Sequence, residues 1–173
     1  MSIFSNYQKS HKNVDFENKR NLYNMTNEID AIKYVSKIII ICKKQYVFSI
    51  KKSPLRPFKD KRLEFFGGNV DQGETPFEGL IRELQEEEMT GILAEKAKAL
   101  KPEPLKSFEV DGKIQCIYQM EITTDEYPKL KAHPDESYGI RSLPQKIFEL
   151  PRTIDLELFT PKTIKIFQNM GLI

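Results

Sequence analysis

The chain of 173 residues has the usual length of one domain, and its apolar content is sufficient for a single hydrophobic core. Its formal net charge of +2 does not by itself indicate a nucleic acid or an anionic membrane as a partner. The two cysteines, Cys42 and Cys116, lack metal-ligand spacing and a disulfide pattern, and no apolar run is long enough for a signal peptide or a membrane span. We therefore expect a cytoplasmic domain with no membrane partner.

Residues 1–30 differ in character from the rest of the chain. They are polar with scattered aromatic residues and follow no clear period, so we interpret them as either an N-terminal arm or an edge element. Residues 31–173 carry the patterned segments, and we expect them to form the domain.

Strands are predicted at several points along this domain. Residues 34–42 and 46–50 are typical of two strands joined by a tight connection, and the first, nearly continuous in isoleucine, is expected to be buried on both faces. Residues 63–66 predict a short strand that leads into a pair of glycines. Residues 114–122 alternate between apolar and mostly polar side chains, which predicts a strand with one face on a core.

Two helices are predicted from their N-terminal caps. Thr75, the following proline and Glu78 form a capping-box pattern, and a second helix is expected to begin at Thr160 with a proline at its first position. In the first helix the apolar residues repeat at i, i+3, i+4 and i+7, so they form one buried stripe: Phe77, Leu80, Ile81 and Leu84. Gly91 is its expected C-terminal stop. The chain is thus of mixed α/β (α+β) class.

Three glutamates lie beside this apolar stripe. Glu83, Glu86 and Glu87 fall within an arc of roughly 100° on the helical wheel. Ionised carboxylates at the border of a core repel one another, and a hard divalent ion such as Mg²⁺ removes that repulsion through oxygen ligands. The alternative is a solvent-exposed acidic face on which Glu78 and Arg82 form a surface ion pair. The glycines and the capping box before the glutamates favour the metal site.

The same segment resembles the Nudix box of the Nudix hydrolase superfamily. From Gly68 the sequence has five residues, Glu74, seven residues, Arg-Glu-Leu at positions 82–84, one residue and Glu-Glu at positions 86–87. The match departs where Phe66 replaces a frequent proline, and where two additional residues precede the final Gly-Ile of the motif. We expect these two residues to lengthen the helix at its C-terminal end.

The resemblance implies an α/β/α sandwich with a mixed β-sheet, and it assigns roles to individual residues. The metal ligands it implies are Glu83, Glu86, Glu87 and the backbone carbonyl of Gly67. Glu83 or a nearby carboxylate would activate the attacking water, and Arg82 would orient the carboxylates. Glu136 is the candidate for an additional metal ligand or general base, and Asp135 is the alternative to it. Glu74 would brace the loop together with Gly73, and the substrate would contact Gly68 and Glu64. Arg62 and Lys52 belong to the basic loop at residues 51–62, whose charge either draws in the phosphates of the substrate or is simply solvated.

The function that this resemblance implies is hydrolysis of a pyrophosphate with Mg²⁺ or Mn²⁺. The expected substrate is a small-molecule nucleotide, either a nucleoside diphosphate linked to another group, such as ADP-ribose or a nucleotide sugar, or a nucleoside triphosphate. The alternative is a Nudix-like module that binds a nucleotide or RNA without cleaving it, because the basic loop at residues 51–62 could also hold an RNA end. A monomer and a homodimer are both compatible with the sequence.

Overall fold

The computed structural model describes residues 32–52, 61–149 and 155–173. The predicted N-terminal arm or edge element of residues 1–30 lies outside these residues. The residues from Lys33 to Ile173 form one compact unit. None of the helices in the part of the chain that is described is long and apolar enough to cross a membrane.

A six-stranded mixed sheet runs through this unit. Five strands follow the order β3-β2-β1-β5-β4, and β6 pairs with β2. β1 and β5 are parallel, whereas the other pairs are antiparallel. The strands are β1 (Lys33–Cys42), β2 (Gln45–Lys51), β3 (Leu63–Glu64), β4 (Lys106–Val110), β5 (Lys113–Glu121) and β6 (Ser137–Pro144).

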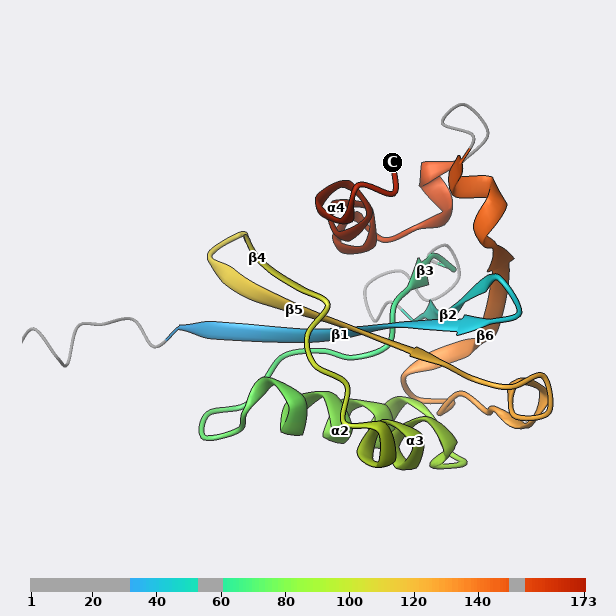
Figure 1. The fold of residues 1–173 in the computed structure, drawn as a ribbon, viewed down its shortest axis with the longest axis horizontal. Coiled ribbons are helices and arrows are strands. Elements are labelled where there is room, and N and C mark those ends of the chain that lie inside the picture. The colour runs from blue at the N-terminus through green and yellow to red at the C-terminus, as the bar shows by residue number, and fades with distance from the viewer. Residues whose placement is uncertain (1–31, 53–60, 150–154) are drawn as a thin grey trace, which may run out of the picture. The chain divides into compact units, whose positions relative to one another are not determined.

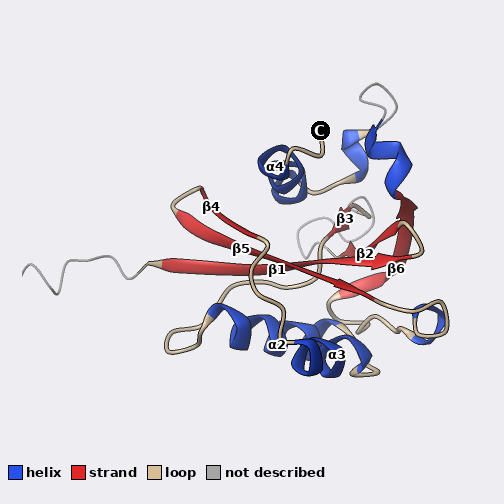
Figure 2. Cartoon of the chain, in the orientation of Figure 1, coloured by secondary structure: helices blue, strands red, loops and turns tan. Residues whose placement is uncertain are grey.

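Helices cover both faces of the sheet, which gives the expected three-layer α/β/α arrangement (Figures 1 and 2). α2 (Pro76–Glu87) and α3 (Ile92–Leu100) lie on one face, and α4 (Pro161–Met170) lies on the other. Short 3₁₀ helices occur at Tyr127–Lys129, Gln145–Glu149 and Leu156–Leu158. α3 and β4 were not predicted from the sequence.

The side chains of β1 explain why the sheet is covered on both sides. Successive residues of a strand point to opposite faces. Ile38 and Ile40 pack in a core with Leu84 of α2, while Ile39 packs in a second core with Phe167 of α4. The burial of both faces of this strand, predicted from its isoleucine run, is confirmed. β5 was expected to bury one face only, but its central residue Ile117 is fully buried in the second core.

β1 has two different partners on the side of β2. β2 pairs with the last three residues of β1, residues 40–42. The earlier part of β1 is bonded instead to the segment that precedes α2. The N–H of Ser36 donates to the carbonyl of Gly68 at 2.9 Å, and the N–H of Val70 donates to the carbonyl of Tyr34 at 3.0 Å. The glycine segment is therefore held against the middle of β1.

The C-terminal end of α2 differs from the expectation. α2 ends at Glu87, and Glu88 has an extended backbone, so the two additional residues do not lengthen the helix. The buried carboxylate of Glu88 accepts hydrogen bonds from the backbone N–H of Thr90 at 2.8 Å and from that of Lys131 at 3.2 Å, which stabilises a turn. Gly91, with a φ of 73°, begins α3 rather than ending the preceding helix.

Candidate active site

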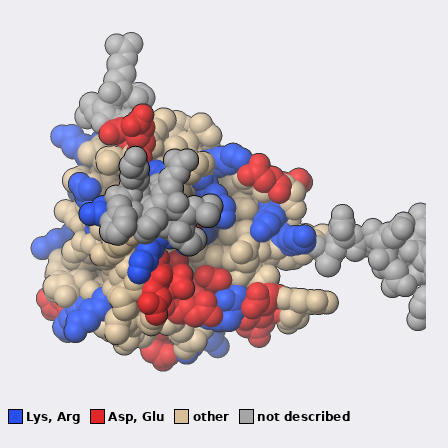
Figure 3. All heavy atoms as spheres, turned by 180° about the vertical axis from the view of Figure 1, so that it is seen from behind, with Lys and Arg blue, Asp and Glu red and all other residues tan. Residues whose placement is uncertain are grey.

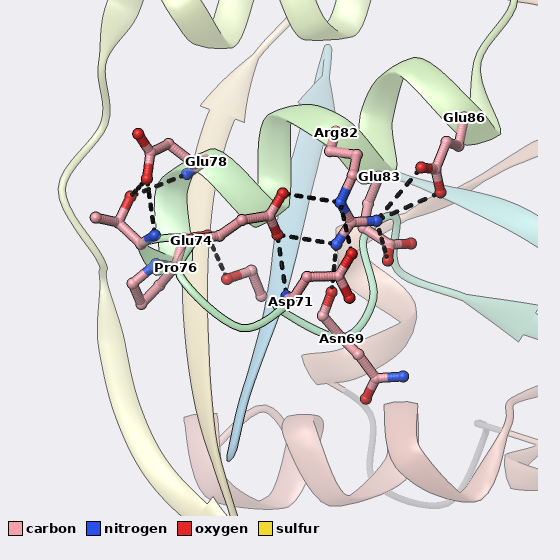
Figure 4. A network of polar contacts seen from close by, with 10 residues as sticks. Asn69, Asp71, Glu74, Pro76, Glu78, Arg82, Glu83 and Glu86 are labelled. Carbon is pink, nitrogen blue, oxygen red and sulfur yellow. Dashed lines mark hydrogen bonds and ion pairs between the residues drawn. The ribbon is translucent and has the colours of Figure 1, made fainter. Parts of the chain in front are cut away.

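The capping box at the start of α2 is present as predicted (Figure 4). The backbone N–H of Glu78 donates to the hydroxyl of Thr75 at 3.2 Å, and the backbone N–H of Thr75 donates to the Glu78 carboxylate at 2.8 Å. Glu78 is therefore engaged with Thr75 rather than acting as the surface partner of Arg82. Leu80 and Leu84 are fully buried, which fixes the rotation of α2.

Arg82 connects the loop before α2 to the acidic edge of the helix (Figure 4). Its Nε and Nη2 donate to the two carboxylate oxygens of Glu74 at 3.0 and 3.1 Å, and Nη2 also donates to the carbonyl of Asn69 at 2.8 Å. Its Nη1 donates to Glu83 at 3.0 Å and to Glu86 at 3.4 Å. One guanidinium thus holds the loop and orients two of the predicted metal ligands.

Glu74 binds the loop before α2 as well as Arg82. Its carboxylate accepts a hydrogen bond of 3.0 Å from the backbone N–H of Asp71. Gly73 lies in the same turn with a φ of 92°, a conformation that favours glycine. Hydrogen bonds from Arg82 and from the Asp71 backbone lower the pKa of the Glu74 carboxyl. These contacts are the ones that a bracing role for Glu74 requires.

Glu87 is the most buried of the three predicted carboxylate ligands, with only 7% of its surface exposed. It accepts a hydrogen bond of 2.7 Å from the backbone N–H of Gly67. Burial raises the pKa of its carboxyl to about 7, although Lys37 and the Gly67 N–H oppose the shift. Burial also raises the pKa of Glu83, against the effect of Arg82. Both carboxylates lie where their charge is costly without a nearby cation.

Both glycines of the motif lie close to neighbouring atoms. Gly67 has a φ of 108°, and a Cβ there would collide with the backbone carbonyl of Ser36. A Cβ at Gly68 would collide with the carboxylate of Glu83. Gly67 can therefore lie against β1 only because it lacks a side chain, whereas a side chain at Gly68 would displace the Glu83 carboxylate.

Lys37, which was not predicted from the sequence, lines the site. Its ammonium donates to the Glu64 carboxylate at 3.0 Å, to the carbonyl of Phe65 at 3.1 Å and to the carbonyl of Gly67. Burial by itself lowers the pKa of Lys37, but Glu64, Glu87 and neighbouring charges bring it above its ordinary value. A lysine inside a strand predicted to be buried on both faces was the available signal, since charged residues are rarely buried without a partner.

A polar pocket brings these groups together from distant parts of the chain. Its lining comprises Val35, Lys37, Lys51, Glu64, Gly67, Gly68, Asn69, Glu83, Glu87, Glu136 and Lys162. Glu86, whose side chain is 54% exposed, is not among the described residues that line it. Figure 3 shows Asp and Glu side chains gathered on one face of the molecule, with Lys and Arg side chains around them. The three predicted carboxylate ligands are thus divided, because Glu83 and Glu87 line the pocket and Glu86 does not.

The donor set of this pocket fits a hard divalent ion. Glu83 and Glu87 offer carboxylate oxygens within one pocket, and Mg²⁺ is commonly bound through one or two carboxylates, waters and substrate phosphates. Among the described residues, however, no three acidic, histidine or cysteine side chains already form a group that could hold a metal. Glu83 and Glu86 are turned toward Arg82, and the Gly67 carbonyl accepts its bond from Lys37. Arg82 and Lys37 are internal cations that already offset part of the repulsion among these glutamates.

The predicted substrate contacts are partly brought together. Glu64 and Gly68 line the pocket, as does Glu136, whose side chain is exposed. Lys52 donates to the carbonyl of Pro134 at 2.7 Å, and neither Lys52 nor Arg62 is among the described residues that line the pocket. The middle of the basic loop, residues 53–60, lies outside the described residues.

Comparison with known proteins agrees with this geometry. The sequence model of the NUDIX domain family matches residues 25–146. At the level of sequence, no curated protein matches the chain. The chain belongs to the NUDIX domain family, which confirms the class predicted from the sequence, a Nudix hydrolase.

Solved structures share the fold at low sequence identity. A NUDIX family hydrolase from Clostridium perfringens is 16% identical with a TM-score of 0.50, over 82% of this chain and 96% of that one. A bifunctional NMN adenylyltransferase/ADP ribose pyrophosphatase from Francisella tularensis is 16% identical with a TM-score of 0.58, over 91% of this chain but only 46% of that one. DR0079 from Deinococcus radiodurans is 23% identical with a TM-score of 0.50, over 68% and 72% of the two chains.

Proposed function

We propose that this protein is a divalent-metal-dependent hydrolase that cleaves the pyrophosphate of a nucleoside diphosphate linked to another group. The observation that carries the proposal is that the carboxylates of Glu83 and Glu87 line one polar pocket together with the glycine turn. Glu87 is buried there and its pKa is raised to about 7 by burial, as expected for a carboxylate that gains a charged ligand in the working enzyme.

The proposed ligands of the metal are Glu83, Glu87 and Glu86, the last after a rotation of its exposed side chain away from Arg82. Bound Mg²⁺ or Mn²⁺ would supply a water of lowered pKa and neutralise charge on the diphosphate. Arg82 keeps Glu83 in place through a hydrogen bond of 3.0 Å. Lys51 and Lys162, which line the pocket, are suited to attract the phosphates.

The proposed reaction is attack of water on one phosphorus of the anhydride. The P–O bond of the bridging oxygen breaks, and the leaving phosphate departs with that oxygen. The proton of the attacking water passes to a carboxylate, for which Glu83 and Glu136 are the candidates because both line the pocket. Asp135, an alternative base considered from the sequence, is exposed and is not among the described lining residues.

ADP-ribose is the first substrate to examine. One solved structure of similar fold is described as an ADP ribose pyrophosphatase, and another structure of that protein is described as a complex with AMP and a Mn ion. We extend to this chain only the class of compound, a small-molecule nucleotide with a diphosphate. We also propose a cytoplasmic location.

The test is hydrolysis of a panel containing ADP-ribose, nucleotide sugars and nucleoside triphosphates with Mg²⁺ or Mn²⁺. We expect the wild type to turn over at least one compound and Glu83→Gln to lose about 100-fold or more in kcat, the range typical of a catalytic carboxylate. Glu95→Gln, at an exposed glutamate of α3, is the matched control and should keep the wild-type rate. Binding of these compounds without turnover of any would favour the non-catalytic module.

A further inference from the structure

Lys37 is buried in the middle of β1, with 4% of its surface exposed. An ammonium group has three N–H donors, and here it has three oxygen acceptors: Glu64, Phe65 and Gly67. All donors are therefore used inside the protein. Such a group is a fixed part of the site rather than a mobile surface charge.

The ammonium of Lys37 binds the carbonyl of Gly67, which was predicted from the sequence to be a metal ligand. The Gly67 peptide is held from both ends: its N–H donates to Glu87 at 2.7 Å, and its carbonyl accepts from Lys37. A carbonyl oxygen that accepts a charge-assisted hydrogen bond offers less electron density to a second cation. An additional cation beside the ammonium would also be repelled at short range.

The charges of the pocket lead to the same conclusion. The carboxylates of Glu64, Glu87 and Glu83 each favour the charged form of Lys37. Lys37 therefore offsets part of the negative charge that would otherwise attract divalent ions. Removing the ammonium would free the Gly67 carbonyl oxygen and leave more negative charge on the carboxylates of the pocket.

We propose that the Lys37 ammonium takes the place of one divalent ion in this site, holding the Gly67 carbonyl that would otherwise coordinate metal. The inference rests on the proposed metal-dependent function, because it concerns how many ions the same carboxylates bind. The protein then uses the glutamates of α2 for its metal and a lysine of β1 as an internal cation.

The test compares Mn²⁺ binding to the wild type and to Lys37→Met by calorimetry, with bound ions counted by electron paramagnetic resonance. Methionine has nearly the length of lysine but no charge. We expect Lys37→Met to bind one more Mn²⁺ per chain than the wild type, and its melting temperature to rise more on addition of Mn²⁺. Equal numbers of bound ions in both proteins would overturn the proposal.

Lys51→Met is the matched control. Lys51 also pairs with Glu64, at 3.9 Å, but its side chain is 41% exposed. Its loss changes the net charge equally, so we expect the wild-type number of ions, and an extra ion in this variant would also overturn the proposal. If neither the wild type nor Lys37→Met binds Mn²⁺, both the Lys37 proposal and the proposed metal-dependent function fail. Metal binding by the wild type with no difference in the variant overturns the Lys37 proposal alone.

A second measurement does not depend on the folding of the variant. The ¹⁵N-labelled ammonium of Lys37 in the wild type can be assigned by NMR through its contacts with Phe65 and Gly67. We expect its signal to remain hydrogen-bonded and slow to exchange with water at saturating Mg²⁺. Loss of that protection on addition of Mg²⁺ would show that the metal displaces the ammonium, contrary to the proposal.

Discussion

Glu87 accepts a hydrogen bond of 2.7 Å from the backbone N–H of Gly67, across 20 residues of the chain. This contact joins the last turn of α2 to the glycine turn beside β1. The buried carboxylate of Glu87 therefore affects both the stability of the fold and the proposed metal binding. Substitutions can separate these two effects.

Glu87→Gln should separate metal binding from folding. Glutamine keeps an oxygen acceptor for the Gly67 N–H and removes a buried charge, so the metal-free protein should melt at the same temperature as the wild type or higher. The stabilisation of the wild type by Mg²⁺ should be largely absent from the variant, because binding to the native state is what produces it. Melting curves with and without Mg²⁺ measure both effects, and equal metal-induced shifts in the two proteins would contradict the assignment of Glu87 as a ligand.

The two neighbouring glycines should respond differently to alanine. Gly67→Ala places a Cβ against the backbone of Ser36 at a φ of 108°, so we expect a loss of roughly 3 kcal/mol in the free energy of unfolding. Gly68→Ala displaces only the Glu83 side chain, so stability should change by less than about 1 kcal/mol. Its kcat should nevertheless fall by about 100-fold because the carboxylate is misplaced. Urea denaturation and turnover of the best substrate check the pair, and similar stability losses in both variants would refute the distinction.

Arg82→Lys should weaken both the loop and the site. A lysine cannot reproduce the two bonds to Glu74 together with those to Asn69 and Glu83. Because the guanidinium is partly exposed, we expect a modest loss of about 1–2 kcal/mol in stability, with a fall of about 10-fold or more in kcat. Arg141→Lys, at an exposed arginine of β6, is the control and should alter neither quantity. Unchanged activity in Arg82→Lys would mean that Arg82 does not position Glu83.

The Lys37–Glu64 ion pair should make stability depend on pH at the acid end. Burial alone raises the pKa of Glu64, but Lys37 and Lys51 bring it below its ordinary value. A lowered carboxyl pKa means that the stabilisation is present above about pH 4.5 and is lost as the pH falls through the pKa of the folded state.

Glu64→Gln has no such carboxylate to protonate. Its free energy of unfolding should therefore lie below that of the wild type at pH 7 and converge with it toward pH 3. Urea denaturation across this range measures the difference, with Glu95→Gln as the exposed control. A constant difference between wild type and Glu64→Gln over the whole range would show that the pair is not the source of the acid sensitivity.

The local sequence determined the elements whose signals are short in range. The capping box of Thr75 and Glu78, the stripe through Leu84 and the isoleucine run of β1 each depend on neighbours a few residues away. The spacing of Glu83, Glu86 and Glu87 likewise follows from helix geometry alone. These features were sufficient to predict the mixed α/β class, whereas the family followed from the resemblance of residues 68–92 to the Nudix box.

Only the tertiary structure decided which charged groups meet. Lys37 reaches Glu64 and the Gly67 carbonyl because the segment that follows β3 and contains the glycines is bonded to β1, a relationship that no local pattern contains. Likewise, Glu88 continues the acidic run in sequence but turns inward to bond with Thr90, whereas Glu86 remains largely exposed. Helical periodicity gives the direction of a side chain, but burial and the partner it finds depend on segments that are distant along the chain.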